Sequence, residues 1–253
     1  MYRKWSRDEE ILALVLYCQI PFGKIHAHNP EIIKLASSLS RTPASVSMKM
    51  CNFARFDSTL TARGITGLQN GSKLDELIWD EFRTNWEGLV IESKLAAERL
   101  NIKPGDDEPE VSDLPIGYTQ EQFINVRRNQ SFFRKAVLSS YEHTCCITGL
   151  AIPKLLIASH IKPWRASDPA AERTNPQNGL CLNALHDRAF DQGLITITPD
   201  YRIELSRLIR DEYDSEIVAQ WFYQYEGTKI RLPNRFAPAK EFLEYHNEHI
   251  FKS

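Results

Sequence analysis

Between Leu155 and Gly193 the chain reads LLIASHIKPWRASDPAAERTNPQNGLCLNALHDRAFDQG. Two short β-rich runs, LLIASHI and GLCLN, are separated by a polar segment and followed by ALHDRAF, whose apolar spacing is helical. Gly193 stands where this short helix should end. We therefore expect a strand, a loop, a second strand and a helix, in that order.

Three polar side chains occupy informative places in this arrangement. His160 lies at the end of the first strand, Asn178 opens the second strand, and His186 lies on the first turn of the helix. A helix packed across the hairpin would let both histidines face one cavity. A neutral imidazole can take a proton from water near pH 7, and a second imidazole can hold a divalent metal. The pattern favours phosphodiester hydrolysis, with Asn178 bracing the loop rather than touching the metal.

The segment resembles the HNH endonucleases of the ββα-metal fold. The resemblance rests on LLIASHIKPW and NGLCLNALHDRAFDQGLITI, and the upstream VRRNQSFFRKAVLSSYEHTCCITGL is similar to the lead-in of these nucleases. It extends over roughly Phe123 to Leu205. It implies a DNA nuclease that uses one divalent ion, Mg²⁺ or similar, with His160 as general base and His186 as a metal ligand.

Two features depart from this family pattern. Many relatives carry an acidic metal ligand directly before the base histidine, where this chain has Ser159. Asp187 and Asp191 are the nearby substitutes, although a side chain on the far side of a short helix would not reach the metal. Many relatives also hold a structural zinc with two CxxC pairs, which the adjacent pair Cys145-Cys146 and the single Cys181 do not supply. We expect no structural zinc.

Basic and aromatic side chains flank these residues. Trp164, Arg165 and Arg173 lie in the loop between the strands and are candidates to contact the DNA backbone, although Trp164 fits equally well as a side chain packed over the hairpin. Three more arginines lie on the helix before the first strand, and a solvated basic face is the preferred interpretation of these; they are Arg127, Arg128 and Arg134.

The first hundred residues have only helix signals. N-cap residues followed by proline or by an acid three positions on mark four helix starts, at Ser6, Asn29, Thr42 and Ser72, the last opening one long helix that ends near Leu100. Asn101 to Tyr118 follows, with five acids and three prolines, and reads as a linker that disfavours a packed interface. We expect a helical domain over 1–100, a linker over 101–118 and a nuclease domain over 119–253.

The helical domain carries a weaker signal for DNA recognition. Ala36, Ser40 and Val46 occupy the small, turn and apolar positions of a helix-turn-helix. The alternative is a purely structural or dimerising bundle. If the first interpretation holds, the second helix and its surroundings would face DNA with Arg41, Ser45, Ser47, Lys49, Asn52 and Arg55.

Composition sets the outer limits. The 253 residues include 31 Lys and Arg against 33 Asp and Glu, so the location of charge and not its sum must identify a DNA surface. No apolar run approaches the roughly 18 residues of a membrane helix, and five cysteines form an odd set that favours reduced thiols. We expect a cytoplasmic protein with no membrane association.

Together these patterns predict an α+β protein in which a helix-turn-helix-like domain precedes a ββα-metal nuclease. Its expected substrate is double-stranded DNA, and cutting both strands most simply needs a homodimer. The combination is similar to bacterial restriction enzymes, some of which cut modified DNA. A DNA-binding regulator with an inactive nuclease fold is the alternative.

Overall fold

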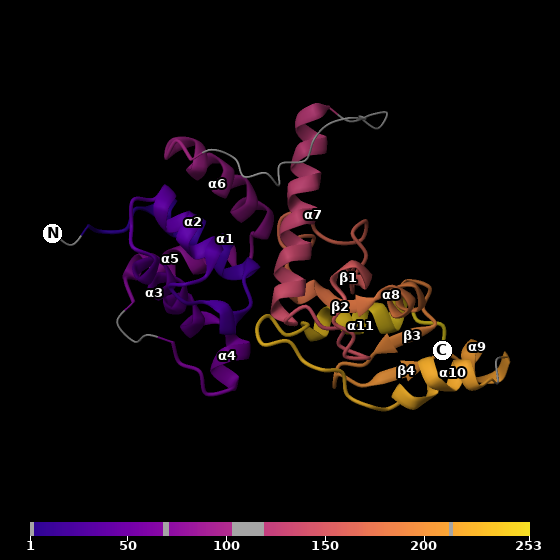
Figure 1. Ribbon diagram of the computed structural model, residues 1–253. Helices are drawn as coiled ribbons and strands as arrows, with labels where there is room; N and C mark the ends of the chain where they lie inside the picture. Colours follow the sequence, from indigo (N-terminus) through magenta and orange to yellow (C-terminus); the bar gives the residue numbers. More distant parts are fainter. Residues whose placement is uncertain (1–2, 68–70, 103–118, 213–214) are drawn as a thin grey trace.

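Figure 1 presents the computed structural model, which describes residues 3–67, 71–102, 119–212 and 215–253. Most of the predicted linker, 103–118, lies outside these ranges, so the predicted domain division stays a prediction. The longer elements are α1 (Arg7–Gln19), α2 (Pro30–Ser38), α3 (Pro43–Phe53), α4 (Ser58–Ala62), α5 (Lys73–Phe82), α6 (Trp86–Arg99), α7 (Gln120–Ser140), β1 (Leu156–His160), β2 (Gly179–Asn183), α8 (Ala184–Asp191), β3 (Ile195–Ile197), β4 (Ile203–Leu205), α9 (Arg207–Glu212), α10 (Glu216–Trp221) and α11 (Lys240–His249). The predicted α+β class is confirmed.

The helical region begins its helices where the capping residues predict. Ser6 and Ser72 form complete capping boxes, and the side chains of Asn29 and Thr42 accept amide hydrogen bonds at the starts of α2 and α3. The single long helix predicted after Ser72 is wrong. α5 ends at Phe82 and α6 starts afresh at Trp86, because Asn85 caps a new helix by accepting from the amide of Gly88.

The C-terminal part is built on a hairpin crossed by a helix. β1 and β2 pair antiparallel, from Leu156 opposite Asn183 to His160 opposite Gly179. Asn183 then caps α8 by accepting from two amides of its first turn. After α8 the chain turns at Gly193, whose φ of 68° lies in the left-handed region that favours glycine. The predicted order of strand, strand and helix is confirmed.

α7 lies between the helical region and the hairpin and belongs to both cores (Figure 1). Phe132 and Ala136 pack into the helical core, whereas Phe133 and Val137 pack into the other. Phe236, from the chain before α11, also joins the helical core. The expectation that the two parts lack a packed interface is therefore wrong, because apolar residues from beyond the linker complete the helical core.

Arg235 ties the C-terminal chain to the end of α1. Its buried guanidinium donates to the carbonyl oxygens of Tyr17 and Ile20 and lies over the Tyr17 ring. The Ser139 hydroxyl of α7 donates to the next carbonyl, that of Cys18, at 2.8 Å. Carbonyls of a last helical turn lack intrahelical donors and carry partial negative charge, so these contacts stabilise the interface.

Across the described ranges, no helix is both long and apolar enough to span a membrane.

Candidate active site

His160 lies at the end of β1 between two aromatic rings. Its ring stacks on Phe133 with centroids 3.7 Å apart, and Trp164 meets it edge-on at 5.6 Å. Its Nε2 lies 2.9 Å from the carbonyl oxygen of Arg173. Because a carbonyl only accepts, Nε2 carries the proton and Nδ1 is the basic nitrogen. Burial lowers the pKa of His160, so the ring is neutral near pH 7 and Nδ1 can accept a proton.

A cavity of about 940 Å³ opens beside this imidazole. Two carboxylates of α8 line it, because Asp187 and Asp191 are four residues apart and so lie on one face of the helix. Ser159 and His160 of β1 line it from the hairpin side. The structure thus brings both predicted substitute acids to the cavity that holds the candidate base.

The two carboxylates have an environment that a cation would relieve. Burial raises the pKa of both, and the charge of Asp187 raises the pKa of Asp191 further. The Ser159 hydroxyl opposes the rise at Asp187, and the charge of Arg188, which also lines the cavity, opposes the rise at both carboxylates. Mg²⁺ binds proteins through one or two carboxylates and keeps several waters. The donors present therefore fit a magnesium-type ion.

Sites that need more protein ligands do not fit as well. No group of three or more His, Cys, Asp or Glu side chains able to hold a metal occurs within the described ranges. All five cysteines are free thiols. The prediction that no structural zinc is present stays a prediction.

His186 does not face this cavity, so the prediction that it shares one with His160 is wrong. One residue along an α-helix turns the side chain by about 100°, and His186 therefore points away from the face that carries Asp187. Its Nε2 lies 2.8 Å from the carbonyl oxygen of Trp221, and its Nδ1 lies 2.9 Å from Nδ2 of the Asn183 side chain. With both ring nitrogens paired and the side chain buried, His186 is not placed as a metal ligand.

Asn178 is fully buried at the base of the loop between the strands. Its Oδ1 accepts from the amide of Lys162 at 2.8 Å, and its Nδ2 donates to the carbonyl oxygens of Lys162 and Glu172. The Ser167 hydroxyl lies 3.2 Å from the same Nδ2. These bonds join both ends of the loop that follows His160, so Asn178 braces the loop. Asn178 does not line the cavity.

The other loop residues divide between bracing and exposure. Arg173 donates from Nε to the carbonyl oxygens of Trp164 and Ser167, so its charge serves the loop. Trp164 packs against His160 and also lines the cavity, and its contact with the DNA backbone stays a prediction. Arg165 is exposed at the same cavity and is the loop arginine best placed to meet a phosphate.

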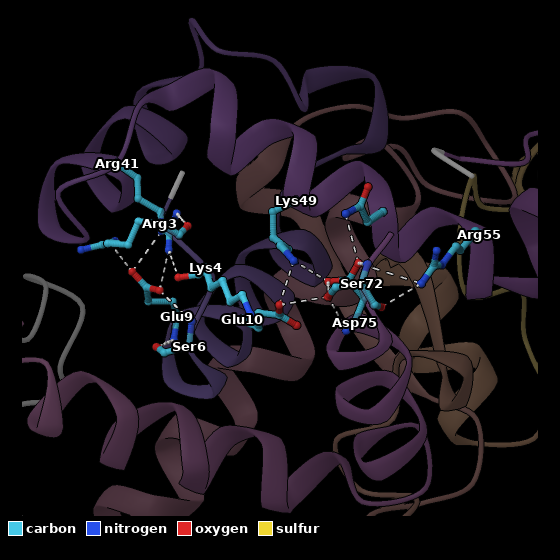
Figure 2. A network of polar contacts seen from close by, with 11 residues as sticks. Arg3, Lys4, Ser6, Glu9, Glu10, Arg41, Lys49, Arg55, Ser72 and Asp75 are labelled. Carbon is cyan, nitrogen blue, oxygen red and sulfur yellow. Dashed lines mark hydrogen bonds and ion pairs between the residues drawn. The ribbon is translucent and has the colours of Figure 1, made fainter. Parts of the chain in front are cut away.

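Four of the six residues predicted to face DNA from the helical region are used internally (Figure 2). Lys49 is 5 % exposed and donates to both Glu10 and Asp75, so its assignment to a DNA groove is wrong. The other three also contact partners inside the helical region. Arg41 donates to Glu9, and Asn52 donates to Asp75. Arg55 donates to the carbonyl oxygen of Ser72 and lies over the Phe56 ring. Ser45 and Ser47 are half-buried on α3 and stay predictions.

Sequence reasoning missed two parts of the site. Phe133 is the platform for His160, and only its place in an amphipathic helix marked it as a core residue. His246 of α11, which the sequence patterns did not single out, also lines the cavity. It is fixed there by the Thr196 hydroxyl and by the carbonyl oxygen of Phe190, next to Asp191.

A comparison with protein families matches residues 145–198 to the HNH endonuclease model. These residues form an HNH endonuclease domain. The HNH match includes β1, the braced loop, β2, α8 and β3, and therefore every cavity residue of the hairpin and of α8 described above. It covers well under half of the chain, and α7 and the helical region lie outside it. No curated protein matches the chain.

Proposed function

We propose that this HNH protein is a metal-dependent endonuclease that hydrolyses phosphodiester bonds of double-stranded DNA in the cytoplasm, as part of a bacterial restriction system. The observation that carries the proposal is the meeting, in one cavity, of an unprotonated Nδ1 on His160 with the carboxylates of Asp187 and Asp191. A base and a cation-binding pair in one cavity are the two requirements of hydrolysis at a phosphate.

In the proposed reaction His160 accepts a proton from water at Nδ1 while the water oxygen bonds to phosphorus. The bond from phosphorus to the 3′ oxygen breaks, and that oxygen takes a proton from solvent. Asp187 and Asp191 would hold the divalent ion, which supplies positive charge to the phosphate and the departing oxygen. The hydrogen bond to the Arg173 carbonyl keeps the proton of the neutral imidazole on Nε2, so that Nδ1 is free to accept the proton of water.

The restriction role extends the proposal to recognition and assembly. One such site cuts one strand, so a homodimer is the simplest way to break both. A helical region joined to a nuclease domain suits a division between recognition and cutting, and Ser45 and Ser47 remain its candidates on α3. Base modification is one property such a region would read.

Plasmid digestion tests the proposal. Supercoiled plasmids that differ only in cytosine modification are incubated with Mg²⁺, Mn²⁺ or excess chelator. We expect cleavage with metal and none with chelator, and a difference between plasmids if modification is recognised. DNA binding without cleavage under every metal would instead support the regulator with an inactive nuclease fold.

A further inference from the structure

α7 has an unbalanced charge. Its described side chains, residues 123–140, include four basic residues and no acidic one. Two of the four are turned away or engaged, since Arg128 lines a cavity against α6 and Lys135 has a partner. The other two, Arg127 and Arg134, are exposed.

Arg127 and Arg134 share one face of the helix. Seven residues at 100° each return to within about 20° of the starting direction, and Gln130 falls between them. The Phe123 ring lies under the Arg127 guanidinium at 5.1 Å. Arg134 donates from one nitrogen to the carbonyl oxygen of Leu156, which fixes the group and leaves its remaining donors at the surface.

This face leads into the active site. Gln130 and Arg134 line a hollow of about 240 Å³ whose other walls include His160 and Trp164. His160 and Trp164 also line the large cavity, together with Asp187. The candidate base therefore lies where the cavity that holds Asp187 and Asp191 meets the basic helix face.

The dimensions suit a nucleic-acid backbone. Seven residues of helix rise about 10 Å, and duplex DNA advances about 3.4 Å per nucleotide along each strand. Arg127 and Arg134 are thus far enough apart to contact two different phosphates of a duplex. α3 has no such cation, because Lys49 is its only basic residue and is buried.

We propose that the α7 face formed by Arg127, Gln130 and Arg134 binds the DNA backbone next to the scissile phosphate, so that DNA approaches His160 along α7. The inference rests on the proposed nuclease function. It replaces the helical region as the main source of phosphate contacts, and it assigns a role to arginines that sequence patterns alone left as a solvated face.

We would test whether this α7 face binds DNA or is only a solvated face by measuring the binding of a short mixed-sequence DNA duplex. The measurement is fluorescence anisotropy in the presence of chelator. In Arg127→Gln/Arg134→Gln we expect Kd to rise about tenfold or more at low salt, and the steepness of log K against log salt to fall by about 1.8, at 0.9 per phosphate contact. Arg134→Lys keeps a charge and should retain most of the slope. Circular dichroism melting checks that the variants fold.

Arg231→Gln is the matched control, because Arg231 is exposed at a separate cavity beside Tyr141 and Asn234. It should leave both Kd and slope unchanged. Unchanged binding by the folded double variant, while the unaltered protein binds and cuts DNA, would overturn the α7 inference alone. An unaltered protein that neither binds nor cuts DNA would instead remove the proposed function. Preferential binding of duplex RNA along the same arginines would overturn the choice of DNA.

Discussion

The helical region and the HNH cavity use the same kinds of side chain in opposite ways. In the helical region Lys49 lies between Glu10 and Asp75, and all three are buried (Figure 2). At the cavity, no salt bridge holds Asp187 or Asp191 among the described residues, and the nearby charge of Arg188 only partly offsets the rise in their pKa values. Charges that are paired inside serve the fold, whereas charges left unpaired at a cavity are available to a ligand. The pairing of a charge is therefore more informative than its presence in a motif.

The largest effect is expected at the HNH cavity. His160→Ala should lower the DNA cleavage rate by about 10² to 10⁴, because a positioned general base contributes that factor. DNA affinity should stay nearly intact. His249→Ala is the control, since His249 is exposed and lies against Tyr245 of its own helix, away from the cavity. Single-turnover plasmid cleavage measures the rate for both variants. Near-normal cutting by His160→Ala would show that His160 is not the general base.

On the paired side, Lys49→Met should destabilise the fold by about 3–5 kcal/mol, because it leaves two buried carboxylates without their cation. Urea unfolding measures this loss. Lys34→Met removes an exposed lysine of α2 and should stay within about 0.5 kcal/mol of the original protein. If Lys49→Met kept full stability but lost DNA affinity, the predicted groove contact would be restored and the contrast between the regions would fail.

A smaller effect should separate two residues of α8, Asp191 and His186. Asp191→Asn removes a cavity carboxylate and should weaken Mn²⁺ binding about ten- to a hundredfold by calorimetry. His186→Gln should leave Mn²⁺ affinity unchanged in the folded protein, because His186 points away from the cavity. A loss of metal affinity confined to His186→Gln would reverse the assignment.

The smallest effect is a pH dependence of the paired side. Burial raises the pKa of Glu10 to about 7 from 4.5, against the opposing charge of Lys49. Because the folded state then holds this proton more tightly than the unfolded state, the stability from Glu10 is full below pH 4.5 and is lost as pH rises through 7. Glu10→Gln keeps the uncharged shape and should flatten the decline of Tm over that range. Parallel Tm curves for the two proteins would contradict the shift.

Local signals were enough for most elements and for part of the site. The capping boxes at Ser6 and Ser72 each involve residues within three positions of one another, so the sequence shows where these helices begin. The start of α8 after Asn183 depends on an equally local signal, because Asn183 caps the first turn of the helix. His160 was named from its place at the end of the first strand of the HNH pattern, and Asp187 and Asp191 were named as nearby substitutes for the acid missing at Ser159; their roles stay predictions.

The misses depend on contacts distant in sequence. Lys49 meets Glu10 and Asp75, which are 39 and 26 residues away, and no periodicity encodes that pairing. His186 was misplaced because its orientation depends on Trp221, whose carbonyl comes from a separate helix 35 residues on. A helical pattern shows which side chains share a face of the helix. It does not show which element that face packs against.

The contact of Arg235 and Phe236 with the helical core also sets an order of events during synthesis. The ribosome releases the chain from its N-terminus, so α1 emerges early and its last carbonyls wait for the guanidinium of Arg235. The helical core is also incomplete until Phe236 arrives, after the whole HNH segment has been made. The helical region therefore cannot reach its final packing until the segment after the HNH match has also been made.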